Sequence, residues 1–348
     1  MLTQVIEKNA SDLHLIVGVR PTLRIDGSLV PIDNEQPLTK DQNQALIEEL
    51  LNPQQKEQYA ANKELDFSYE HQSKNRFRIN VYYEKDHPAA ALRLIPSTIK
   101  SINELNLPAV CHSFAQLRQG FILVTGPTGH GKSTTLAAII ESINRNRAEH
   151  IITIEDPIEY VHHPQNSIIS QRELHADTHS WSVALRSVLR EDPDVVLVGE
   201  MRDYETIAAA LTVAETGHLV LATLHTNSAA QTVDRIVDVF PEHQQAQIRL
   251  QLSNTIEAIF SQRLIPGIKG GRVPAAEVLL ASPAVRNTIR EAKTHQIDNI
   301  IQTSADLGML SLESSLAHWV RNEVITLEKA QEYALRPDEL MRLLKTGS

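Results

Sequence analysis

The stretch Phe121-Ile-Leu-Val-Thr-Gly-Pro-Thr-Gly-His-Gly-Lys-Ser133 decides the fold of this chain. Its final part satisfies the phosphate-loop pattern Gly-x-x-x-x-Gly-Lys-Ser and stands between a β-branched strand and an expected helix over residues 134–143. This order of strand, glycine-rich loop and helix is typical of an α/β domain that binds nucleotide phosphates. An ordinary glycine-rich turn capped by Ser133 is the less favoured interpretation.

Each position of this loop has a physical task. Glycines let backbone N–H groups close around phosphate oxygens, and the following helix adds positive potential at its N-terminus. Lys132 is expected to reach the β- and γ-phosphates, and Ser133 to ligate Mg²⁺. His130 is unusual, but it occupies a variable position, so a tolerated substitution is favoured over a catalytic imidazole. The predicted ATP-binding residues are Gly126, Pro127, Thr128, Gly129, His130, Gly131, Lys132, Ser133 and Thr134.

The composition is that of a globular protein and restricts its partners. A length of 348 residues, with 42% hydrophobic and 22% charged residues, favours two domains over one. The formal net charge of -10 opposes broad attraction to nucleic acid. Cys111 is the only cysteine, which excludes an internal disulfide and a thiolate-rich zinc site. Residues 1–8 lack the apolar core of a signal peptide and no apolar run is long enough to span a bilayer, so we expect a cytoplasmic protein without direct membrane insertion.

The segment before the loop indicates a small α+β domain over residues 1–96. Short apolar runs alternate with turn signals, and Asp26-Gly27 reads as a hairpin turn. Thr39 is expected to cap a helix that ends before Asn52. Further strands are expected at residues 65–69, 76–83 and 89–95.

The rest of the chain divides into a linker, a larger domain and a helical end. Residues 97–118 are interpreted as a linker with one helix, 110–117. Residues 119–280 alternate apolar strands with helical stretches, which predicts an α/β domain with a largely parallel sheet. Residues 281–348 are expected to be helical and could form a third, smaller unit. The expected strands of the larger domain are residues 121–125, 151–155, 195–198 and 219–223.

Three polar segments follow strands of the larger domain. The strand 151–155 leads into Glu155, Asp156 and Glu159, although Asp156 also suits a plain turn. A later apolar strand ends before Glu200, and the next one leads to His225. Because open α/β sheets bind their ligands at the carboxyl ends of the strands, these residues are candidates for one site with the phosphate loop.

These motifs together resemble the type IV pilus retraction ATPases, the PilT-type twitching motors of the secretion ATPase superfamily. In chain order they are similar to that family's Walker A, aspartate box, atypical Walker B and histidine box. The resemblance implies an N-terminal α+β (PAS-like) domain followed by a RecA-like P-loop ATPase domain with C-terminal helices. Stretches typical of retraction motors are Ala10-Ser-Asp-Leu-His-Leu15, Arg76-Phe-Arg-Ile-Asn80, Leu92-Arg-Leu-Ile-Pro96 and Ala284-Val-Arg-Asn-Thr-Ile-Arg-Glu291.

The carboxylates are the expected catalytic groups. ATP hydrolysis needs an aligned, deprotonated water, and Glu200 is the first choice as its base. Gly199 stands where many P-loop enzymes place a magnesium-binding aspartate, so the resemblance implies that Glu200 positions water and Mg²⁺ together. It also implies that Glu159 serves Mg²⁺ and water, and that Glu155 has a positioning role. The expected Mg²⁺ ligands, directly or through water, are Ser133, Glu159 and Glu200.

The basic candidates come from both predicted domains. His225 is expected to sense the γ-phosphate, while His218 either bridges subunits or domains or is merely structural. Arg78 and Arg93 resemble family arginines that close onto the phosphates when the two domains meet, a task that suits a guanidinium group. Surface arginines on exposed strands are the alternative.

The resemblance implies a motor assembled from copies of this chain. A homohexamer would hydrolyse ATP, act on an inner-membrane pilus platform protein and drive pilus retraction, with the protein peripheral at the inner membrane. The alternatives are a nucleotide-binding accessory paralogue with little hydrolysis, which could also be a partner, and a pilus assembly or type II secretion ATPase. Those secretion and assembly ATPases usually carry a longer N-terminal region and a four-cysteine zinc element, which this sequence does not contain. A nucleic-acid translocase is a remote alternative.

Overall fold

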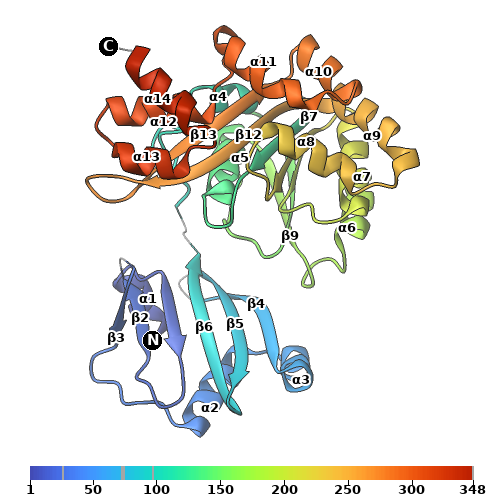
Figure 1. Cartoon of the computed structure of the whole chain (residues 1–348). Coiled ribbons are helices and arrows are strands. Elements are labelled where there is room, and N and C mark those ends of the chain that lie inside the picture. Colours follow the sequence, from blue (N-terminus) through green and yellow to red (C-terminus); the bar gives the residue numbers. More distant parts are fainter. Residues whose placement is uncertain (26, 72–74, 96–97, 347–348) are drawn as a thin grey trace. The chain divides into compact units, whose positions relative to one another are not determined.

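The computed structural model describes residues 1–25, 27–71, 75–95 and 98–346. It divides into two compact units, Met1–Thr98 with Pro157–Val161, and Ile99–Asp156 with His162–Ser348. Each unit has its own sheet and its own buried core (Figure 1). Asp26 of the expected hairpin turn and Pro96 at the predicted domain boundary lie outside the described residues.

The first unit is built on an antiparallel sheet with the strand order β3-β2-β1-β6-β5-β4. Thr39 caps a helix through a capping box with Gln42, as the sequence predicts. A second capping box, Asn52 with Gln55, begins a helix that the pattern did not predict. The elements are α1 (Leu2–Glu7), β1 (Asp12–Leu15), β2 (Thr22–Ile25), β3 (Ser28–Pro31), α2 (Lys40–Leu50), α3 (Pro53–Asn62), β4 (Glu64–Glu70), β5 (Arg76–Glu84) and β6 (His87–Ile95).

The second unit contains a seven-stranded sheet in the order β13-β12-β7-β11-β10-β8-β9. All neighbours are parallel except β12 and β13. The four strands predicted from the sequence form the centre of this sheet, while the strands at both edges were not predicted. The strands are β7 (Gly120–Thr125), β8 (His150–Glu155), β9 (Ile168–Glu173), β10 (Val195–Val198), β11 (Leu219–Leu224), β12 (Ile256–Pro266) and β13 (Arg272–Leu280).

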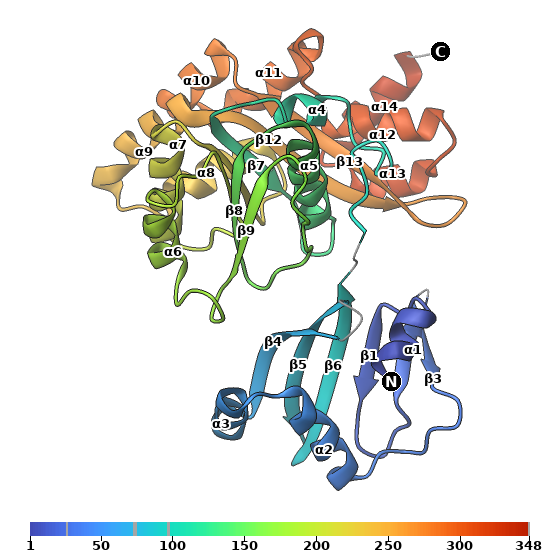
Figure 2. The ribbon, with the colours of Figure 1, turned by 180° about the vertical axis from the view of Figure 1, so that it is seen from behind.

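Helices cover both faces of this sheet, as Figure 1 and the opposite view in Figure 2 show. Phe121 and Leu123 of β7 face one buried cluster, whereas Ile122 and Val124 face the other, because side chains alternate along a strand. The first cluster includes residues of α6 (Trp181–Val188), α7 (Tyr204–Glu215), α8 (Ala229–Asp238) and α9 (Glu242–Thr255). The second includes residues of α4 (Val110–Phe114) and α5 (Lys132–Asn146).

Two predicted boundaries differ from the observed packing. The expected linker 97–118 is largely part of the second unit, because Ile102, Cys111 and Phe114 are buried in its core. Its helix α4 ends at Phe114, three residues earlier than expected. Burial of these apolar side chains stabilises the segment against the sheet instead of leaving it as a connector.

The C-terminal helices extend the second unit and do not form a third one. Residues of α10 and α11 join the core of the large sheet, while α12 to α14 pack on β12 and β13 around a smaller cluster with Ile265 and Leu316. These elements are α10 (Pro283–Arg290), α11 (Ile297–Thr303), α12 (Leu312–Arg321), α13 (Leu327–Tyr333) and α14 (Pro337–Thr346). Throughout the part of the chain that the structure describes, no helix has both the length and the apolar character to cross a bilayer.

Candidate functional site

The phosphate loop joins β7 to α5 and rests on β12. Gly126 has φ +141°, and a Cβ there would lie only 2.2 Å from the carbonyl oxygen of Gln262. Gly131, at φ +81°, precedes α5, and its Cβ would lie 2.9 Å from the Gln262 side-chain nitrogen. Gly126 therefore requires glycine for conformation and for space, and Gly131 requires it for conformation. The less favoured interpretation, a turn capped by Ser133, is wrong, because α5 begins at Lys132 and its N-cap is Gly131.

The side-chain amide of Gln262 holds the loop through both its nitrogen and its oxygen. Its Nε2 donates to the carbonyl oxygen of His130 (2.8 Å), and its Oε1 accepts from the Thr135 hydroxyl (2.6 Å). The side chain is only 2% exposed, so these bonds are shielded from water. Gln262 was not predicted from the sequence, because nothing distinguishes it there from the neighbouring polar residues Ser261 and Arg263 of β12.

Lys132 is held by carbonyl groups of the loop itself. Its Nζ donates to the carbonyl oxygens of Gly126 (2.9 Å) and Pro127 (3.1 Å), and the residue is 8% exposed. A buried ammonium is costly unless it is paired with acceptors, and these carbonyls supply them. The loop therefore concentrates a positive charge where the phosphates are expected.

His225 connects this lysine to Glu200. The His225 Nδ1 atom lies 3.5 Å from Lys132 Nζ and 3.3 Å from the Thr128 hydroxyl, and its Nε2 lies 3.0 Å from Glu200 Oε1. If Nδ1 accepts from Lys132, the ring proton lies on Nε2 and is donated to Glu200. Strands β7, β11 and β10 are parallel neighbours, which brings the three residues to one edge of the sheet.

Glu200 is ionised at neutral pH. Burial raises the pKa of its carboxyl group, but the hydrogen bond from Arg202 (2.8 Å) and the nearby positive charges outweigh burial and hold the pKa below its ordinary value. Those charges are Arg202 and Lys132. The residue therefore carries a carboxylate that can accept a proton or orient a water molecule.

Gly199 explains why no aspartate precedes Glu200. A Cβ at Gly199 would lie 3.2 Å from the Ile154 carbonyl oxygen, 3.3 Å from Glu155 Cα and 3.3 Å from the Trp181 ring. Each of these distances is tighter than an ordinary contact, so an aspartate would displace its neighbours. The carboxylate at this strand end is therefore supplied by the following residue.

Glu155 ends β8, the strand next to β10. Its Oε1 accepts from the Thr153 hydroxyl (2.6 Å) and from Gln171 Nε2 (3.2 Å), which fixes the carboxylate against β9. His218 lies at the opposite end of β11, where its ring contacts the Val213 carbonyl oxygen (3.0 Å) at the end of α7. Within this chain His218 is thus far from the strand ends that carry the phosphate loop.

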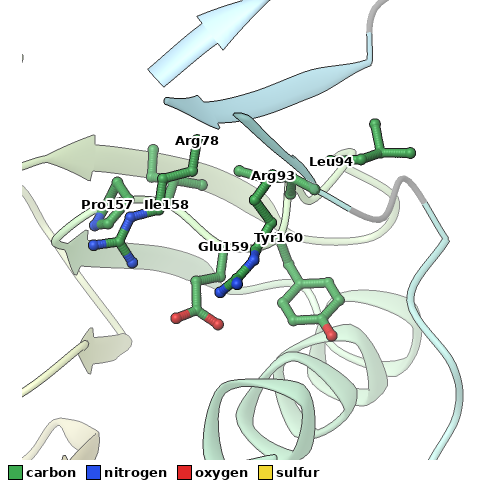
Figure 3. A pocket seen from close by; sticks show the side chains of 8 residues that line it. Arg78, Arg93, Leu94, Pro157, Ile158, Glu159 and Tyr160 are labelled. Carbon is green, nitrogen blue, oxygen red and sulfur yellow. The ribbon is translucent and has the colours of Figure 1, made fainter. Parts of the chain in front are cut away.

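Arg78, Arg93 and Glu159 line a pocket in the first unit (Figure 3). The two arginines are direct partners across β5 and β6. Arg93 Nε donates to Asp12 Oδ1 (2.8 Å), and Arg78 lies 3.9 Å from Asp66. Asp12 is 8% exposed; burial raises its pKa, but bonds from Ser11 and Arg93 outweigh burial and keep the pKa below its ordinary value.

The expected catalytic residues thus fall into two groups. The phosphate loop, Glu200 and His225 meet at one edge of the second sheet, with Glu155 on the adjacent strand. Arg78, Arg93 and Glu159 belong to the first unit. A RecA-like parallel sheet with a phosphate loop, a carboxylate and a histidine at one edge defines the class of the protein as a P-loop ATPase.

Comparison with known proteins gives the family. Residues 1–307 match the family described as Type II/IV secretion system protein, and this chain belongs to it. The chain is 47% identical over 332 residues to the "Type IV pilus retractation ATPase PilT" of Pseudomonas aeruginosa. The aligned region covers 95% of this chain and 96% of that protein. It is 38% identical over 349 residues to the "Type IV pilus ATPase PilU" of the same organism, covering 100% and 91%.

A solved structure agrees with these relatives. The crystal structure of "the Pilus Retraction Motor PilT and Bound ADP" superposes with a TM-score of 0.92 at 45% identity and covers 98% of each chain. The family resemblance and the fold class predicted from the sequence motifs are confirmed.

Proposed function

We propose that this chain is an ATP-hydrolysing motor that powers type IV pilus retraction. The observation that carries the proposal is the line of contacts from Lys132 through His225 to Glu200, because it couples the phosphate loop to a carboxylate that can act on water. The names of the relatives supply the pilus context, since both describe pilus ATPases.

In this proposal the second unit holds ATP and performs the hydrolysis. Backbone N–H groups of residues 126–134 and the Lys132 ammonium bind the phosphates, and Glu200 orients and deprotonates the attacking water. Loss of the γ-phosphate removes negative charge beside Lys132. His225 contacts both Lys132 and Glu200, and it relays this change to Glu200. Glu155, at the end of the neighbouring strand β8, helps to position the groups of this site.

The residues at the loop fit a magnesium ion. Mg²⁺ prefers hydroxyl, carboxylate and water oxygens, and when bound it neutralises charge between the β- and γ-phosphates. Ser133 stands in the first turn of α5 and offers its hydroxyl. Glu200 already contacts His225 with one oxygen and Arg202 with the other, so this carboxylate fits Mg²⁺ through water better than by direct ligation. Glu159 is a further proposed ligand.

Arg78 and Arg93 supply the proposed mechanical step. We infer that the first unit closes onto bound ATP and brings these guanidinium groups to the phosphates, where fixed positive charge stabilises the transition state. In a homohexamer, sequential closure would move an inner-membrane platform protein and release pilin from the fibre base. The pairing of the arginines across β5 and β6 supports a joint role, because it places both at one pocket.

The proposal is tested by deleting the gene and imaging the pili. Excess pili that do not retract are the expected result, because assembly then proceeds unopposed. Cells without pili would contradict the proposal and indicate an assembly motor.

An accessory nucleotide-binding paralogue is the second candidate, because the match to PilU spans the whole chain. The purified protein distinguishes the two. Hydrolysis by the assembled wild-type protein alone supports the motor, whereas ATP binding without hydrolysis supports the accessory role.

A further inference from the structure

His130 ties the phosphate loop to β12 through its side chain as well as its backbone. Its Nδ1 atom accepts a hydrogen bond from the backbone N–H of Leu264 (3.0 Å), next to the bond that its carbonyl accepts from Gln262. The pairing of β12 with β7 ends at Ser261, so Leu264 lies beyond that ladder. The imidazole thus accepts from a main-chain donor that β7 does not reach.

The surroundings of His130 keep its imidazole neutral. The ring is half-buried, and its centre lies 6.4 Å from that of Tyr333 on α13. Burial and three cations, Arg263 on β12, Arg272 on β13 and Lys132 on α5, hold the pKa of His130 below its ordinary value. An Nδ1 that accepts a hydrogen bond leaves the single ring proton on Nε2.

We propose that His130 is a positioning residue for nucleotide binding, whose neutral imidazole holds the phosphate loop against β12 in the shape that receives phosphate. The loop contains three glycines with positive φ, so it has few side chains of its own to restrict it. An anchored loop loses less conformational entropy when its N–H groups close on a phosphate. The inference rests on nucleotide binding at this loop, one part of the proposed function, and not on pilus retraction.

Protonation removes this anchor. An imidazolium donates from both nitrogens, so it cannot accept from the Leu264 N–H, and that partly buried donor is left without the acceptor it now has. The added charge alone would attract phosphate more strongly. Loss of the anchor lowers the affinity for phosphate, whereas the added charge raises it. The direction in which ADP affinity changes with pH therefore shows which effect is larger.

Two variants separate the acceptor from the ring. His130→Asn offers Oδ1 near the position of Nδ1 and does not titrate, whereas His130→Phe keeps an aromatic ring beside Tyr333 but has no acceptor. The measurement is the Kd of ADP with Mg²⁺ for the full chain, by calorimetry at pH 7.5 and pH 5.5. Melting temperatures at both pH values verify that each protein is folded.

At pH 7.5 we expect the asparagine variant to bind ADP like wild type, and the phenylalanine variant to bind about three- to tenfold more weakly, the effect of one hydrogen bond. Between pH 7.5 and 5.5 the wild type should lose affinity relative to the asparagine variant, but by less than this factor, because the lowered pKa of His130 leaves part of the imidazole neutral at pH 5.5. All ionisable groups other than position 130 are the same in the three proteins, so the ratio of wild type to asparagine variant isolates position 130.

Two results would overturn the inference. Wild-type affinity in the phenylalanine variant would show that the acceptor is unimportant. A wild type that gains affinity relative to the asparagine variant at pH 5.5 would show that the added charge, and not the anchor, controls binding. Absence of ADP binding at every pH is a different failure, since it removes the nucleotide site itself.

Discussion

The two sheets gather their functional side chains in different ways. In the second unit, parallel strands end at one edge, which brings Lys132, Glu200 and His225 together although they are far apart in sequence. In the first unit, antiparallel register places Arg78 opposite Arg93 within the strands. The Glu200 side chain is 23% exposed and that of Arg93 68%. The candidate phosphate site of the second unit is thus held by mutual contacts of its side chains, whereas the first unit presents more exposed cations.

The largest effect is expected from Glu200→Gln, which removes the carboxylate from the preorganised edge. ATP hydrolysis should fall about 10²- to 10⁴-fold, the usual contribution of a general base, while ADP affinity stays near that of wild type. The assay is phosphate release by the purified protein. Glu205→Gln, at an exposed glutamate of α7, is the matched control and should hydrolyse ATP normally. Unchanged turnover in the Glu200 variant would remove this residue from the catalytic role.

Arg78→Ala tests whether the first unit contributes to the same reaction. If its guanidinium stabilises charge on the phosphates, kcat should fall about 10²-fold, the lower end for removal of one such group. KM and kcat are measured separately, with Arg20→Ala as the control because Arg20 is an exposed arginine of the same unit. Equal activity of both variants would confine the chemistry to the second unit.

Glu277 tests how the core of the second unit responds to pH. This residue of β13 is 1% exposed and accepts from the Ala229 N–H (2.7 Å) at the start of α8. Burial raises its pKa from 4.5 to about 7, although the Ala229 bond and Arg336 oppose the shift. The folded state therefore binds the proton more tightly than the unfolded state, and stability falls as the pH rises from 4.5 through about 7.

Glu277→Gln should abolish this pH dependence and keep the acceptor for Ala229. Relative to the glutamine variant, the wild type should lose about 2 to 3 kcal/mol of unfolding free energy between pH 5 and pH 8. Thermal unfolding across this range measures the difference, with the exposed Glu49→Gln as control. Parallel profiles for wild type and the Glu277 variant would mean that the carboxyl group titrates alike in the folded and unfolded states.

The smallest effect is expected from Asp12→Asn. This change removes the charge that holds Arg93, but the arginine is largely exposed, so the pair contributes at most about 1 kcal/mol of stability. Turnover should fall less than tenfold, with little change in melting temperature. A loss as large as that of Arg78→Ala would instead show that the Asp12 contact fixes the active orientation of Arg93.

The site edge was predictable from sequence because Lys132, Glu200 and His225 each follow an apolar strand closely. Their mutual contacts were not, since strand order is a property of the folded sheet. Gln262 escaped detection because its partner loop lies 132 positions away and its strand has no motif. The apolar residues of the expected linker, such as Ile102 and Phe114, are too widely spaced in the sequence to predict that this segment packs on the large sheet. The joint role of Arg78 and Arg93 on ATP stays a prediction.

Whether hydrolysis drives movement is tested most directly in cells. A deletion strain is complemented with wild type or with Glu200→Gln at equal protein level, and labelled pili are followed one by one. We expect wild type to restore shortening of pili and the variant to leave them extended. Normal shortening with the variant would contradict the claim that hydrolysis at this edge drives retraction.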